Sequence, residues 1–142
     1  MAMFFGGKSK ETVSVGDVDL DERELVQMLS FVRLVIGVGF FLMPRRLGRW
    51  WTGEEDISTT SRMALRGLGG RDVALAIGTL IVLENDANVR GWLEAGALAD
   101  ASDAVSTLTN WGDLPSLRRL LGVASSVSAT VAGVNLAQSF DD

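Results

Sequence analysis

The chain of 142 residues contains no cysteine, no histidine and no tyrosine. These absences exclude disulfides, thiolate metal sites, iron–sulfur clusters, His-ligated haem and nucleophiles activated by a histidine. Lysine occurs only as Lys8 and Lys10, and 13 Lys+Arg stand against 18 Asp+Glu, which gives a net charge of −5. Such a chain lacks the basic surface with which nucleic-acid-binding proteins contact phosphate groups. We therefore expect a non-enzymatic protein with no cofactor, no metal and no nucleic-acid partner.

Hydrophobic residues make up 47% of the chain, and its length is that of one domain. This composition excludes a disordered polypeptide. Residues 1–24 form a polar, acidic N-terminal tail, in which Thr12 to Val15 alternate like a short strand. Residues 25–142 hold the long apolar runs and form the second region.

Four segments of the second region predict membrane-crossing helices. Residues 25–43 carry a single charge, Arg33, and end at Pro44. At about 1.5 Å per residue this run covers roughly 28 Å, close to the ~30 Å hydrocarbon thickness of a bilayer. Further helices are predicted at 63–83, 90–109 and 116–139. The predicted fold is all-α, a bundle of four transmembrane helices with the lipid bilayer as its partner.

Four tryptophans predict interfacial anchors. Trp50 and Trp51 follow the first span directly, beside Arg45, Arg46 and Arg49. Trp92 and Trp111 bracket the third helix, about 28 Å apart along its axis, which fits the two aromatic belts of one membrane.

The positive charges predict an orientation. Loops 45–62 and 112–119 lie on one side of the predicted bundle, and both termini lie on the other with the turn at 84–90. The first side collects seven arginines and the second four Lys+Arg. Because cytoplasmic loops carry the excess of positive charge, the sequence predicts a multi-pass protein of the cell membrane with both termini outside.

Charged residues inside three of the predicted spans form a candidate network. They are Arg33, Arg71, Asp72, Asp100 and Asp103. At helical rise, all lie roughly 12–20 Å below the outer boundary. An unpaired charge at that depth costs from a few to more than ten kcal/mol, so we expect these groups to face inward and pair. Asp100 and Asp103 share one helix face that could receive both arginines. Glu94, nearer the surface, is expected to reach the interface or to pair with Arg90.

The last predicted helix carries lines of small residues. Gly122, Ser126 and Thr130 recur at every fourth position, and Gly133 continues a second line. Small residues let neighbouring helix backbones approach closely in a membrane. The sequence thus favours an accessory or assembly subunit that packs on itself, as a homo-oligomer, or on a larger membrane complex through this helix.

Two alternatives stay open. The charged network is either a satisfied polar core or a site that handles a small solute or protons, because ionisable groups inside a membrane are functional candidates. A soluble helical bundle is the second alternative. No loop or motif in the sequence supports catalysis.

The segment from Gly69 to Gly78, GGRDVALAIG, resembles a Gly-x-Arg-Asp segment of small prokaryotic four-helix membrane proteins of unknown function, near the DoxX-like grouping. Asp100-Ala101-Ser102-Asp103 is similar to their Asp-x-x-Asp in the third helix. The resemblance covers about residues 25–138 and implies an integral membrane four-helix bundle. It implies no activity.

Overall fold

The computed structural model describes residues 12–15 and 18–140. Its elements are β1 (Thr12–Val15), β2 (Val18–Asp21), α1 (Glu22–Leu42), α2 (Pro44–Thr52), α3 (Thr59–Glu84), α4 (Arg90–Thr109), a 3₁₀ turn η1 (Trp111–Asp113) and α5 (Ser116–Ser139). The predicted helical fold is confirmed in its class, and the strand expected at 12–15 is confirmed as β1. A short antiparallel hairpin, in which Val13 pairs with Leu20, therefore precedes the helices, which makes the fold not strictly all-α.

The helix ends follow local signals. Glu24 accepts a hydrogen bond from the backbone N–H of Asp21, which starts α1 three residues before the predicted boundary. Ser58 caps α3 by accepting from the N–H of Ser61 at 3.0 Å. Pro44 ends α1 as predicted but also opens α2, a helix that the sequence did not predict, because proline suits the first position of a helix.

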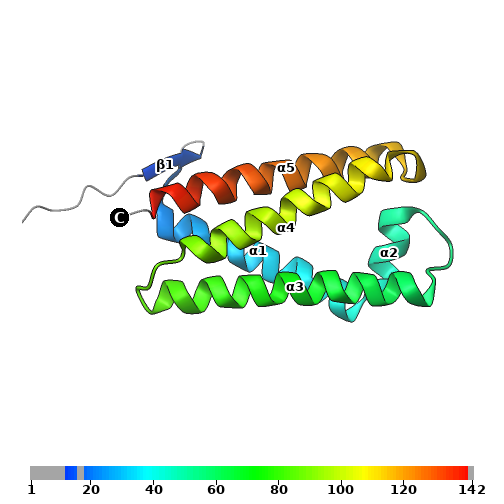
Figure 1. Ribbon diagram of the computed structural model, residues 1–142, viewed down its shortest axis with the longest axis horizontal. Helices are drawn as coiled ribbons and strands as arrows, with labels where there is room; N and C mark the ends of the chain where they lie inside the picture. The colour runs from blue at the N-terminus through cyan, green and yellow to red at the C-terminus, as the bar shows by residue number, and fades with distance from the viewer. Residues whose placement is uncertain (1–11, 16–17, 141–142) are drawn as a thin grey trace, which may run out of the picture.

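The four long helices form two pairs. α1 packs along α3, and α4 packs along α5, whereas contacts between the pairs are sparse. Figure 1 shows α4 and α5 side by side, with α3 across the bundle from them and α2 at the end opposite the C-terminus. The chain runs up and down, so both ends of the helical region lie at the same end of the bundle as the α3–α4 turn.

Glycines set how closely α1 and α3 approach. A Cβ added at Gly37 would stand 2.8 Å from the carbonyl oxygen of Gly69, and one added at Gly69 would stand 2.6 Å from the backbone nitrogen of Phe41. Backbone thus faces backbone at this crossing, as in membrane helices joined through small residues.

The small-residue lines of α5 pack inside the molecule. A Cβ at Gly133 would lie 3.1 Å from the Cβ of Ala97, and Thr130 donates to the carbonyl of Ala97 at 3.4 Å. Gly122 likewise faces Thr107 of α4 and the ring of Trp51. The face that the sequence offers to an external partner is therefore covered by α4.

By length and hydropathy, two of the described helices, α1 and α5, could cross a membrane, against the four spans predicted from the sequence. The other two predicted spans correspond to α3 and α4. These helices carry four of the five predicted network charges: Arg71, Asp72, Asp100 and Asp103.

Candidate functional site

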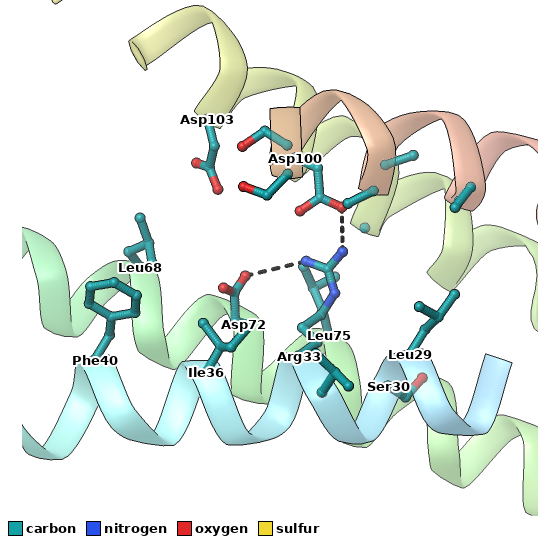
Figure 2. A pocket seen from close by; sticks show the side chains of 18 of the residues that line it. Leu29, Ser30, Arg33, Ile36, Phe40, Leu68, Asp72, Leu75, Asp100 and Asp103 are labelled. Atoms are coloured by element: carbon teal, nitrogen blue, oxygen red, sulfur yellow. Dashed lines mark hydrogen bonds and ion pairs between the residues drawn. The ribbon is translucent and has the colours of Figure 1, made fainter. Parts of the chain in front are cut away.

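The five predicted network residues lie together in the middle of the bundle. Arg33 of α1 donates to Asp100 of α4 through one guanidinium nitrogen and to Asp72 of α3 through another, at 3.4 Å. Figure 2 shows this bridge, with Asp72 and Asp100 on opposite sides of the Arg33 guanidinium.

Arg71 completes the network on its other side. Its two terminal nitrogens meet the two oxygens of Asp103, at 3.0 and 2.7 Å, in the two-pronged geometry that arginine forms with carboxylates. Its Nη2 also donates to Asp72 at 3.0 Å. The order of contacts is therefore Asp100, Arg33, Asp72, Arg71, Asp103, and it links α1 and α3 to α4.

The network is largely shielded from solvent. The side chains of Asp72 and Asp100 are 10% and 12% exposed, and that of Arg33 is 21% exposed. Arg71 and Asp103 are more open, at 31% and 29%. An ion pair as buried as Arg33 and Asp100 stabilises a protein only while both partners are present, because either alone is an uncompensated buried charge.

Two glycines lie directly beside these side chains. Gly37 lies one turn after Arg33, and a Cβ there would reach the Cβ of Asp72 at 3.0 Å. Gly96 lies one turn before Asp100, and a Cβ there would stand 3.5 Å from Nη2 of Arg33. Neither glycine is among the site residues predicted from the sequence. The signal was present, since each glycine stands four residues from a charged residue on the same helix face.

A cavity of about 570 Å³ lies between the two helix pairs, next to the network. Arg33, Asp72, Asp100 and Asp103 line it, and Figure 2 shows the three carboxylates turned into the space between α3 and α4. Its size falls within the range of small-molecule sites. A cavity of this kind leaves no direct mark in a sequence, since its walls come from α1, α3, α4 and α5.

The two sides of the cavity differ in the size of the side chains that line them. Large apolar side chains of α1 and α3 form one side, among them Ile36, Leu68 and Leu75. Small residues of α4 and α5 line the other side, and their short side chains leave the cavity open: Gly96, Ala97, Ala129, Ala132 and Gly133. Thr107 and Asn110, predicted to continue the stripe of Asp100 and Asp103, also line it.

One end of the bundle is closed by packing. A buried apolar cluster lies there, to which α1, α3, the start of α4 and α5 each contribute one residue: Val26, Leu83, Val89 and Leu136. Arg23 secures the same end by an ion pair with Asp86 at 2.8 Å. The predicted pair between Arg90 and Glu94 is confirmed at 2.7 Å and lies on the exposed surface of α4.

The predicted tryptophan anchors lie near the two ends of the bundle, and two of them, Trp51 and Trp92, also line the cavity. Trp50 is 55% exposed and lies under the guanidinium of Arg118, 6.0 Å from the ring centre. Arg119 lies over Trp111 at 4.9 Å. The indole of Trp92 fills the space above Gly78 of α3.

A comparison of the chain with protein-family models, with curated proteins and with solved structures finds no match. The likeness to DoxX-like proteins stays a prediction.

Proposed function

We propose that the chain is a non-catalytic integral membrane protein, with four membrane-crossing helices, that binds a small molecule in the cavity between its two helix pairs. The observation that carries this proposal is the cavity of about 570 Å³ beside a shielded charged network. Ionisable groups inside a membrane protein mark ligand or ion sites by default.

The distribution of side chains supports the membrane location. Charges meet in the interior, whereas large apolar side chains face outward on all four long helices. Examples are Val35 (70% exposed), Met63 (67%), Leu98 (74%) and Leu117 (68%). A water-soluble bundle would expose this many large apolar side chains only at interfaces. In a bilayer, the same side chains contact the apolar acyl chains of the lipids.

Helix length supports four membrane spans, although only α1 and α5 are also apolar enough over their length to be recognised as spans by hydropathy. α3 has 26 residues and α4 has 20, which correspond to roughly 39 and 30 Å at helical rise. Each is long enough for the hydrocarbon core, and their charges are paired in the network. The arginine-rich end with α2 is assigned to the cytoplasmic side, which places both termini outside.

The accessory-subunit role is the weaker proposal. It rests on the small-residue lines of α5, and in the structure those lines already contact α4. The outward face of α5 is mainly apolar, with Leu117, Leu120, Val127 and Val131, although Ser128, Asn135 and Gln138 are exposed on it as well. That surface suits lipid, so the geometry favours the ligand-binding alternative.

Single cysteines test the proposal, because the native chain has none. Glu55 in the α2–α3 loop and Ala87 in the α3–α4 turn are both exposed, and they lie at opposite ends of the bundle. The variants Glu55→Cys and Ala87→Cys are each placed in sealed vesicles. We expect a membrane-impermeant maleimide to label only one of them from outside, and detergent to be required for extraction. Labelling of both from one side would contradict four spans.

Two neighbouring positions test the cavity in the same background. Ser126 lines the cavity, whereas Val127 faces outward and is 46% exposed. Since maleimides react with the thiolate, a cysteine in a hydrated cavity reacts faster than one in lipid. We expect Ser126→Cys to react faster with N-ethylmaleimide than Val127→Cys. The reverse order would indicate a soluble bundle with a dry interior.

A further inference from the structure

We propose that the cavity takes an organic cation with an apolar body, an alkylammonium, whose charged head lies against the free carboxylate oxygens of Asp72 and Asp100. This inference rests on the proposed function, because it assigns a ligand class to the same cavity.

The charge balance of the site favours a cation. Two arginines and three aspartates make up the network, so its formal charge is 2 − 3 = −1. Arg71 does not line the cavity, whereas all three aspartates do. The cavity therefore presents three carboxylates and one guanidinium. A ligand with one positive charge would make the site neutral, which a shielded, low-dielectric position strongly favours.

Two oxygens are available to such a ligand. Within the described part of the chain, Asp72 accepts hydrogen bonds only through Oδ1 and Asp100 only through Oδ2. The second oxygen of each carboxylate has no donor, and neither oxygen is sealed away from open space. Both residues line the cavity. Asp103 differs, because Arg71 occupies both of its oxygens.

A bare metal ion fits the same oxygens poorly. Among the described residues, no three acidic side chains are grouped so as to hold a metal ion. Arg33 stands between Asp72 and Asp100 and bonds to both, so a divalent ion there would bring two positive charges next to a guanidinium, whereas an ammonium group brings one. An ammonium group brings hydrogen-bond donors without needing a full oxygen shell, unlike Ca²⁺ or Mg²⁺.

The rest of the cavity favours an apolar body on that cation. Beyond the network its lining is mainly hydrophobic, and the α1 wall is not sealed: Leu29, Val32 and Ile36 line the cavity yet are 39%, 52% and 47% exposed. α1 and α5 make few contacts with each other. In a bilayer this open side faces acyl chains, so an amphiphile has a direct route to the site.

Photoreactive amphiphiles test the inference. The native protein is placed in phosphatidylcholine nanodiscs, and three diazirine-bearing probes of equal chain length are compared: dodecylamine, dodecanol and dodecanoate. At about pH 8 the amine and the carboxylate are both charged. Mass spectrometry then locates the adducts. We expect the amine to label cavity-lining residues about tenfold more than the alcohol, as a charge-assisted hydrogen bond implies, and unlabelled dodecylamine to compete.

Two variants and a matched control identify the site. Asp100→Asn removes the excess charge and should reduce amine labelling to the level of the alcohol. Glu94→Gln removes one negative charge from the same helix outside the cavity and should leave labelling unchanged. If Asp100→Asn does not fold, Ala129→Leu reduces the cavity from a lining position outside the network and should abolish saturable labelling.

The outcomes separate the two proposals. Equal cavity labelling by all three probes, or stronger labelling by dodecanoate, overturns the cation assignment and leaves the binding cavity in place. Labelling by every probe that is confined to outward positions such as Val35 and Leu98, with no competition, overturns both. Cavity labelling by the amine that survives Asp100→Asn and Ala129→Leu also refutes the assignment.

Discussion

Replacement of Arg33 by leucine is expected to destabilise the protein far more than the loss of an ordinary ion pair. In the structure Arg33 is the partner of Asp100, and the Asp100 side chain is 12% exposed. Asp72 keeps Arg71, so the substitution leaves one uncompensated buried carboxylate. Breaking a buried pair in this way costs about 3–5 kcal/mol. The Arg90–Glu94 pair, with side chains 44% and 52% exposed, is the matched control, and Arg90→Leu should cost about 0.5 kcal/mol.

The assay is unfolding of the protein in mild detergent by a titration with dodecyl sulfate, followed by tryptophan fluorescence. The double variant Arg33→Leu/Asp100→Leu removes both charges and should recover most of the stability lost in Arg33→Leu, because paired charges in an interior are replaceable by apolar groups. The reasoning is refuted if Arg33→Leu costs no more than Arg90→Leu. It is equally refuted if the double variant loses the sum of both single effects.

Three glycines give further predictions. Gly37→Ala should destabilise the bundle by about 1–3 kcal/mol, because its Cβ would stand 2.8 Å from the carbonyl oxygen of Gly69 and the helices must separate. Gly67→Ala, which meets nothing within 4 Å, should instead stabilise by about 0.5–1 kcal/mol in the same unfolding titration. Gly78→Val would overlap the indole of Trp92 and should shift tryptophan emission to longer wavelength, whereas an unchanged spectrum would contradict the packing.

The helices could be read from the sequence because their boundaries carry local signals. α5 begins and ends where predicted, at Ser116 and Ser139: it follows Pro115, and its body from residue 120 onward is free of charge. α3 begins four residues earlier than predicted, since the cap is Ser58. The helix α2 was missed because Pro44 was read only as the end of the preceding helix, although proline also suits a helix start.

The charged residues could also be chosen from the sequence, because depth along each helix follows from residue count. Their pairing could not be fixed, since it depends on which helices adjoin. The sequence left open which carboxylate each arginine would meet; the structure assigns Asp100 to Arg33 and Asp103 to Arg71. The cavity, and the contact of Gly133 with Ala97 of α4, depend on how the helices pack against one another. No local sequence pattern encodes that packing.

The contact between Gly37 and Gly69 has a mechanical consequence. Where the two backbones touch, α1 and α3 cannot approach further, and their long contact favours movement of the two helices as one unit. α4 and α5 also pack closely at Gly133, where an added Cβ would stand 3.1 Å from the Cβ of Ala97. Widening of the cavity between the pairs would then be a hinge motion of one pair against the other, and it would stretch the two ion pairs that cross between them, Arg33 with Asp100 and Arg71 with Asp103.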